Sequence, residues 1–173
     1  MTAPAFPAGT TPAKLLYPDL ATELASTRRM LERVPDNNDE YKPHAKSMTL
    51  SKLATHIAEL PTFGTLIAQT DGYDFGTGDW KTPSIANNAE RLALFDKNAA
   101  ELTSVMEGAD WTKLSAEWAL TMGEHVIVKD VKSTLLRTMC LSHIAHHRAQ
   151  LGVYLRELDL VVPGMYGPSA DEM

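Results

Sequence analysis

The chain has little of what marks secreted or membrane-spanning proteins. It contains one cysteine, Cys140, among 173 residues. A disulfide within the chain is therefore excluded, and a reducing compartment is expected. The sequence has no run of about 18 apolar residues, which excludes a membrane-spanning helix. Its first residues also lack the charged start and apolar stretch of a secretory signal. Together these absences predict a cytoplasmic protein.

Basic residues are scarce as well. The chain has 16 Lys and Arg against 22 Asp and Glu, which gives a formal net charge of -6 at pH 7. The basic residues are scattered and form no run that would follow a phosphate backbone, so nucleic acid is not an expected partner. A membrane surface is disfavoured for the same reason. The composition is 44% hydrophobic, which is ordinary for a globular protein, and the length fits a single domain over residues 1–173.

What the chain does have is a periodic pattern of apolar residues. Four segments carry apolar side chains at helical spacing, at residues 12–34, 50–70, 85–107 and 133–158. Thr49 and Ser84 are the expected N-caps of the second and third segments, and Asp130 or Ser133 that of the fourth. Gly108 is a natural stop for the third. Packing four helices around one apolar core makes an all-α, four-helix bundle the expected fold.

The remaining segments are expected to connect these helices. Residues 1–11 should form a loose N-terminal arm. Residues 71–83 contain three glycines and predict a long loop, and long loops in compact domains often border a functional site. Residues 111–128 indicate either a β-hairpin or a long irregular connection. Pro61 interrupts the second helical segment, which either kinks there or bends around it.

Two histidines of the last helical segment are spaced for metal binding. His143 and His147 are four residues apart, and residues at i and i+4 of a helix lie on one face with about 5–6 Å between their Cβ atoms. Leu136 and Met139 lie on the same arc, which therefore faces the core, whereas His146 falls toward its edge. The two imidazoles aim at a common point, as they do in zinc sites built on helices.

His56 is the best candidate for a third ligand. Two buried imidazoles need partners for their ring nitrogens, and a metal ion binds a lone pair of each while keeping both rings neutral. His56 lies in the apolar stripe of the second helical segment, whereas His44 and His125 fall in predicted loops. A core histidine alone is more often hydrogen-bonded than metal-bound. The i, i+4 pair shifts the balance toward a metal site.

Two segments carry a resemblance to a known family. MTLSKLATHIAEL, around His56, and HIAHHRAQLGVYLRELDLVVPGMYGPSADE resemble the DinB (YfiT-like) family of metal-dependent enzymes. The resemblance extends over nearly the whole chain. It implies an up-down-down-up four-helix bundle and a divalent ion, often nickel or zinc and in other cases iron or manganese. Carried over residue by residue, the family's ligands are His56, His143 and His147. Relatives are often homodimers, so the resemblance implies a homodimer, while the sequence itself leaves the oligomeric state open.

Three histidines leave coordination positions open, which is typical of a catalytic metal site rather than a structural one. The resemblance implies a metal-dependent thiol S-transferase that joins a low-molecular-weight thiol cosubstrate to a small electrophile, because some relatives do this. A metal-dependent hydrolase is an alternative, and so is a stress-associated metal-binding protein without catalysis. The sequence assigns no catalytic side chain.

Several other side chains have two interpretations. Cys140 is either a fourth ligand or, more in keeping with its surroundings, a reduced core cysteine. Glu59 is either an acceptor for a ligand N–H or a solvated surface carboxylate. Gln150 either hydrogen-bonds within the bundle or contacts substrate, and Arg148 points off the metal face toward an ion pair or a subunit contact. Three aromatic residues either cover the site or pack in the ordinary way: Trp80, Trp111 and Trp118.

Overall fold

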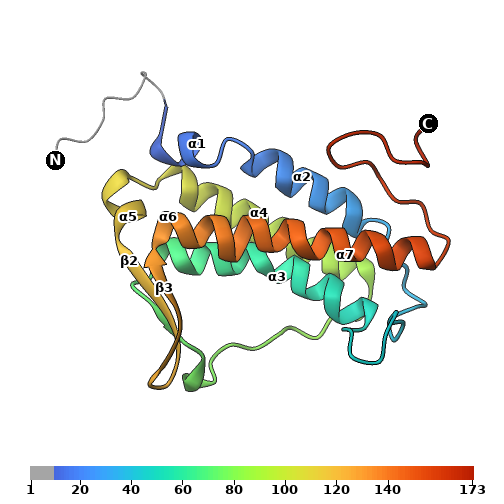
Figure 1. Cartoon of the computed structure of the whole chain (residues 1–173), viewed down its shortest axis with the longest axis horizontal. Coiled ribbons are helices and arrows are strands. Elements are labelled where there is room, and N and C mark those ends of the chain that lie inside the picture. The colour runs from blue at the N-terminus through green and yellow to red at the C-terminus, as the bar shows by residue number, and fades with distance from the viewer. Residues whose placement is uncertain (1–9) are drawn as a thin grey trace.

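The computed structural model describes residues 10–173 and shows a mostly helical chain with a small sheet at one end (Figure 1). The loose arm expected for residues 1–11 lies outside the described residues except for its last two positions. In Figure 1, helices α2, α3, α4 and α7 lie side by side, and the sheet stands at the end where α5 and α6 lie. Among the described residues, no helix is long and apolar enough to cross a membrane. The elements, in chain order, are α1 (Pro12–Leu16), α2 (Leu20–Leu31), α3 (Leu50–Gln69), β1 (Tyr73–Asp74), η1 (Phe75–Thr77), α4 (Asn88–Glu107), α5 (Trp111–Ser115), β2 (Glu117–Met122), β3 (His125–Val131), α6 (Lys132–Leu135), the π-helix η2 (Leu136–Ser142) and α7 (His143–Glu157).

The first predicted helix is two helices in the structure. A single helix over residues 12–34 was expected, but α1 ends at Leu16 and α2 begins at Leu20. Pro18 disfavours helical backbone at the residue before it, and Tyr17 has φ -134°. The hydroxyl of Tyr17 then donates to the carbonyl of Ser133 at 2.6 Å. The break therefore ties the start of the chain to the beginning of the last helical segment.

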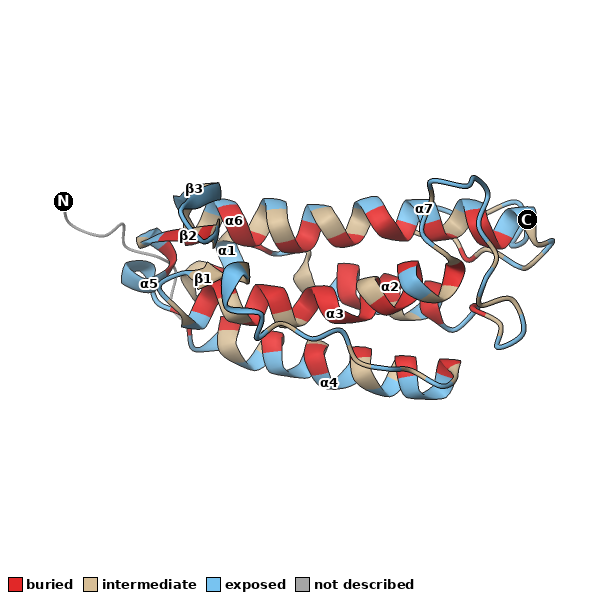
Figure 2. Cartoon of the chain, turned by 90° about the horizontal axis from the view of Figure 1, so that it is seen from below, coloured by how far each residue is buried: buried red, intermediate tan, exposed pale blue. Residues whose placement is uncertain are grey.

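Helix α3 is the central element of the core. Thr49 caps it as expected, since its side chain accepts a hydrogen bond from the backbone N–H of Lys52. The helix continues through Pro61 to Gln69 without ending there. Most of its residues are buried, as the red bands along α3 in Figure 2 show. Gly64 allows close packing, because an added Cβ would lie 2.7 Å from Sγ of Cys140.

Helix α4 begins later than the sequence predicts. Ser84 was the expected N-cap, but the cap is Asn87, whose side chain accepts from the backbone N–H of Glu90 at 2.9 Å. Residues 84–87 therefore extend the long loop instead of forming the first turn of the helix. The end of the helix is as predicted, with Gly108 at the C-cap.

A three-stranded sheet corrects the all-α expectation. Strands β2 and β3 form the antiparallel hairpin that residues 111–128 allowed. Strand β1, which the sequence did not predict, pairs with β2 in parallel. The carboxylate of Asp74 accepts from the backbone N–H groups of Gly76 and Gly123, so one side chain joins the loop after α3 to the hairpin turn. Trp118 of β2 is buried and donates to Thr70.

The last helical segment changes its winding partway. Neither Asp130 nor Ser133 caps it as expected: its N-cap is Val131, which makes no side-chain cap bond. Four α-helical residues are followed by the π-helix η2, and α7 begins at His143. A π-helix bonds each N–H one residue further back along the chain than an α-helix does, and such segments are frequent at functional sites.

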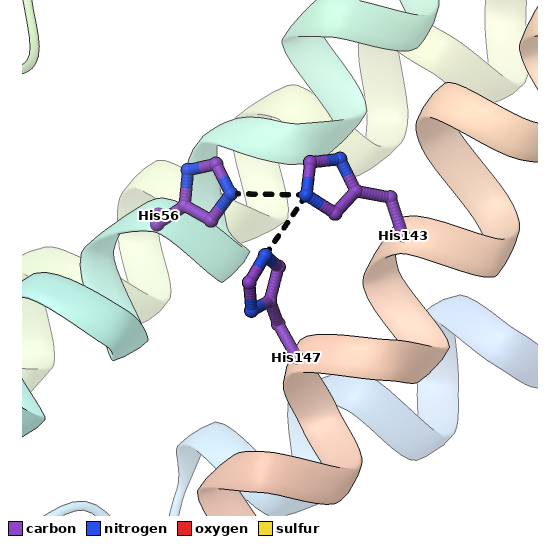
Figure 3. A group of neighbouring side chains, drawn as sticks. All are labelled: His56, His143 and His147. Carbon is purple, nitrogen blue, oxygen red and sulfur yellow. Dashed lines mark hydrogen bonds between the residues drawn. The ribbon is translucent and has the colours of Figure 1, made fainter. Parts of the chain in front are cut away.

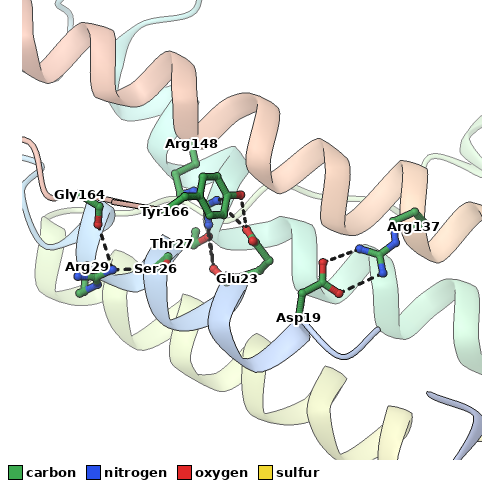
Figure 4. Close-up of polar contacts among 9 residues, drawn as sticks. All are labelled: Asp19, Glu23, Ser26, Thr27, Arg29, Arg137, Arg148, Gly164 and Tyr166. Carbon is green, nitrogen blue, oxygen red and sulfur yellow. Dashed lines mark hydrogen bonds and ion pairs between the residues drawn. The ribbon is translucent and has the colours of Figure 1, made fainter. Parts of the chain in front are cut away.

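Buried and half-buried ion pairs hold α2 against the last helical segment (Figure 4). Arg148 is 2% exposed and donates to the carboxylate of Glu23 at 2.6 Å and to the hydroxyl of Tyr166 at 2.7 Å. Arg137 makes two bonds to the carboxylate of Asp19. The sequence predicted that Arg148 points off the metal face, toward an ion pair or a subunit contact. The structure shows the ion pair.

Candidate metal centre

Three imidazoles from two helices meet at one point (Figure 3). His56 comes from α3, and His143 and His147 come from successive turns at the start of α7. Nε2 of His143 lies 2.8 Å from Nε2 of His147 and 3.5 Å from Nε2 of His56. The three candidate ligand atoms all lie within 4.8 Å of one another. The chain therefore gathers the three histidines that its sequence singled out, with His147 buried and the other two half-buried.

The spacing of these nitrogens fits a shared ion. Two nitrogen ligands about 2.0–2.1 Å from one metal lie about 2.9 Å apart at a right angle and about 3.4 Å apart at the tetrahedral angle. The separations of 2.8 and 3.5 Å lie just beyond the two ends of this range. The three candidate ligand atoms lie within 4.8 Å of one another, and rotation of the side chains would bring all three nitrogens onto one cation.

The outer ring nitrogens hold the protons, which leaves the inner ones free to coordinate. Nδ1 of His147 lies 2.7 Å from Oε1 of Gln150 and donates to it. The backbone carbonyl of Met139 accepts from the ring of His143, and since Nε2 of His143 faces the other imidazoles, the donor is Nδ1. In neutral rings so arranged, both Nε2 atoms carry lone pairs. Two lone pairs 2.8 Å apart repel, and a metal ion between them removes that repulsion.

The junction between the π-helix η2 and α7 contributes to this arrangement, because the N–H of His143 bonds only three residues back there. In a regular α-helix the backbone N–H of His143 would occupy the carbonyl of Met139. Here that N–H bonds to the carbonyl of Cys140, and the carbonyl of Met139 accepts from the His143 ring. The irregular winding thus fixes the tautomer of a candidate ligand, as hydrogen-bonded carbonyls do for metal-binding histidines in general.

Burial keeps the three rings neutral. Removal from water is the largest cause that lowers the pKa of His56, and together with the neighbouring imidazoles of His147 and His143 it brings this pKa to about 4. Burial is also the largest cause that lowers the pKa of His143 and of His147. Neutral imidazole is the form that binds a metal, so the electrostatics of the site favour coordination at neutral pH.

A hollow of about 420 Å³ opens beside His56. Its walls are one face of α3, Met48 before it, and three residues that precede α4: Thr82, Pro83 and Ile85. The first two of these belong to the long loop that the sequence expected to border the site. Glu59 is buried and is the sole acidic side chain among the described residues that line it. Burial raises the pKa of Glu59, while a hydrogen bond from the side chain of Thr82 lowers it by less. The burial was missed because a glutamate in a helix is usually solvated.

Other candidate residues lie apart from the three nitrogens. Cys140 is 1% exposed and its Sγ lies 3.6 Å from the carbonyl oxygen of Leu60, so it is a core thiol. His146 is exposed, and its ring packs on His147. Trp80 packs against aromatic residues of α3 and the long loop, and Trp118 packs in the same way, so neither covers the histidines. Three residues remain on the surface: His44, Trp111 and His125.

A profile of the DinB family matches residues 10–173, almost the full length of the chain. The chain belongs to the DinB family. Its resemblance at the motifs around His56 and the last helix is thereby confirmed. Among curated proteins, this DinB-family chain is 23% identical over 151 residues to the uncharacterized protein YrdA of Bacillus subtilis, covering 87% of this chain and 85% of YrdA.

Solved structures share the fold of this DinB-family protein. A DinB-like protein from Bacillus subtilis, YjoA, superposes with a TM-score of 0.68 at 18% identity, covering 90% of this chain and 99% of that one. A DinB-like protein from Bacillus cereus ATCC 10987 gives a TM-score of 0.63 at 22% identity, with 87% and 95% covered. At these identities the likeness is one of fold.

Proposed function

We propose that this DinB-family protein is a divalent-metal-dependent enzyme in which His56, His143 and His147 hold the ion. The observation that carries the proposal is the convergence of three Nε2 atoms, with the lone pairs of His143 and His147 facing each other. Nitrogen ligands of this kind suit nickel and zinc, and also iron; manganese, which the family also uses, is a further candidate. When bound, the ion supplies Lewis acidity, which lowers the pKa of a thiol or water in its coordination sphere.

We propose thiol S-transfer to a small electrophile as the reaction, with a low-molecular-weight thiol as cosubstrate. The three-histidine group includes no fourth protein ligand among the described residues, and a site with open positions is typical of catalysis. Gln150 and the carbonyl of Met139 hold the ligand rings in their coordinating tautomers. Glu59 lies in the same hollow as His56, where its raised pKa suits a group that gives and takes a proton.

The test is thiol-dependent consumption of an electrophile such as monochlorobimane by metal-loaded protein. We expect turnover with a low-molecular-weight thiol, no turnover without metal, and no turnover by His143→Ala. The matched control is His146→Ala, which removes an exposed histidine of the same helix and should leave the rate unchanged. If metal-loaded protein shows no turnover with any thiol while it hydrolyses ester or amide substrates, the protein is a hydrolase instead. Stoichiometric metal without either activity would favour the stress-associated metal-binding protein.

The proposal also covers the architecture and setting of the enzyme. We propose an up-down-down-up four-helix bundle for α2, α3, α4 and α7, because α2 and α7 run one way in Figure 1 and α3 and α4 run the other. We further propose a single cytoplasmic domain that forms a homodimer, takes a small-molecule substrate and binds neither nucleic acid nor membrane. The net charge of -6 supports the last point. Light scattering on the eluted protein tests the dimer.

A further inference from the structure

A buried arginine lies behind the wall of the hollow that His56 lines. Arg91 of α4 is 1% exposed. Its guanidinium donates to the hydroxyl oxygens of Ser51 at 3.2 Å and Thr55 at 3.5 Å, and to the side-chain oxygen of Asn88 at 2.9 Å. The carboxylate paired with it, on Asp39, is 3.9 Å away and 43% exposed. The positive charge is therefore directed at α3 and balanced only at a distance.

The two hydroxyl groups relay this charge into the hollow. Both Ser51 and Thr55 line it. Because a guanidinium can only donate, each oxygen accepts from Arg91 and its own hydrogen must find another acceptor. Thr27 and Thr103 donate to the carbonyl four residues back in their helices. No such acceptor serves the hydroxyls of Ser51 and Thr55 among the residues the structure describes, so both hydrogens remain available to a ligand.

An ammonium group stands at the rim of the same hollow. Lys52 is exposed and lines it one turn before His56. No carboxylate pairs with this ammonium within residues 10–173. Among the described residues that line the hollow, the acidic side chain is Glu59, whose pKa burial raises. Asp36 and Asp39 do not line it, and their charges act on Arg91. The lining thus offers a cation and two hydroxyl donors to an anion.

We propose that this hollow binds a small molecule with a carboxylate group, held by Lys52 and the hydroxyls of Ser51 and Thr55. We identify this molecule with the electrophilic substrate, which rests on the proposed function. The reason is that His56 lines the same hollow. A volume of about 420 Å³ accommodates a compact organic acid. Its apolar part would contact three side chains of the lining: Met48, Pro83 and Ile85.

The test compares 4-phenylbutyrate with its primary amide by titration calorimetry on chelator-treated protein, so that no metal can hold the carboxylate. We expect the acid to bind about tenfold more tightly than the amide, as charge-assisted hydrogen bonds imply. Lys52→Gln should remove most of this preference. Thr55→Val, which keeps the side-chain shape, should reduce it about threefold to fivefold. The matched control is Lys81→Gln, which removes an ammonium from the neighbouring hollow on the other side of Glu59 and should change nothing.

The outcomes separate this inference from the proposed function. Equal binding of acid and amide, or equal effects of Lys52→Gln and Lys81→Gln, would overturn the carboxylate site even if the protein binds metal and turns over a thiol. A carboxylate preference that persists in His143→Ala and depends on Lys52 would uphold the site even if no metal binds. Since Lys52 is on the surface, its variant is expected to fold, and a thermal melt verifies this for each variant.

Discussion

At the residue scale, the behaviour of His56 is governed by its removal from water. Burial and two neighbouring imidazoles lower its pKa from 6.5 to about 4. The unfolded chain therefore binds more protons than the folded one between these values, and the folded state loses stability as the pH falls through that window. We predict that the free energy of unfolding of metal-free protein decreases from about pH 6.5 toward pH 4.

Two variants isolate the contribution of His56 in denaturant unfolding measured across this pH range. His56→Gln should flatten the pH dependence, because it removes the group whose pKa shifts most among the three histidines. His146→Gln replaces an exposed histidine and should leave the slope as in the natural sequence. An unchanged slope in His56→Gln would mean that its ring is not desolvated in solution.

The three histidines of the candidate metal centre were predictable from the sequence. The i, i+4 spacing of His143 and His147 and the apolar stripe around His56 are properties of sequence alone, and the three rings do meet. The burial of Arg91 and Arg148 was not predictable, because arginine is rarely buried unless paired and the partners, Thr55 and Glu23, lie on other helices. Such pairs depend on tertiary packing.

At the scale of elements, the contact between α3 and η2 depends on a missing side chain. An added Cβ at Gly64 would lie 2.7 Å from Sγ of Cys140 and 3.0 Å from a methyl carbon of Leu102. We predict that Gly64→Ala destabilises the protein by about 1–3 kcal/mol, the usual cost of overpacking a core. Adding Cys140→Ala should recover part of that loss, because it removes the sulfur atom. Urea unfolding of the single and double variants measures both, and strict additivity would contradict the contact.

The ion pair between α2 and α7 supports a second prediction at this scale. Arg148→Met leaves the carboxylate of Glu23 buried without its partner and should cost about 3–5 kcal/mol in the free energy of unfolding. The matched control is Arg156→Met, since Arg156 pairs with Asp171 while 49% exposed and its loss should destabilise the protein far less than the loss of Arg148. Similar losses in the two variants would refute the distinction between the buried and the exposed pair.

Elements were predicted better in their existence than in their boundaries. The helical spacing of apolar residues predicted the long helices, because a helix that buries one face carries apolar residues at that spacing. The break at Tyr17 and the late start of α4 at Asn88 depend on local backbone preferences that compete over a few residues. The π-helix and the two-residue strand β1 have no period of their own. The π-helix and β1 depend on packing against neighbouring segments. A local sequence pattern does not predict such packing.

At the scale of the whole molecule, metal binding should stabilise the fold. The candidate ligands join α3 to α7, and an ion that binds only the folded state adds about 2.7 kcal/mol at a free concentration one hundred times its dissociation constant. For a protein of this size that corresponds to a rise in Tm of about 5–11 °C. We predict this rise on adding nickel or zinc to chelator-treated protein, followed by calorimetry. The rise should be absent in His143→Ala, and its persistence there would point to binding elsewhere.

The most direct test of the three-histidine metal centre is the metal content of the folded protein. Elemental analysis after loading and desalting should find one divalent ion per chain in the natural sequence and in His146→Ala. The content should fall to background in His56→Ala, His143→Ala and His147→Ala, provided each variant keeps its helical circular dichroism. Absence of stoichiometric metal from the natural sequence, or full retention of metal by folded His143→Ala, would contradict the account.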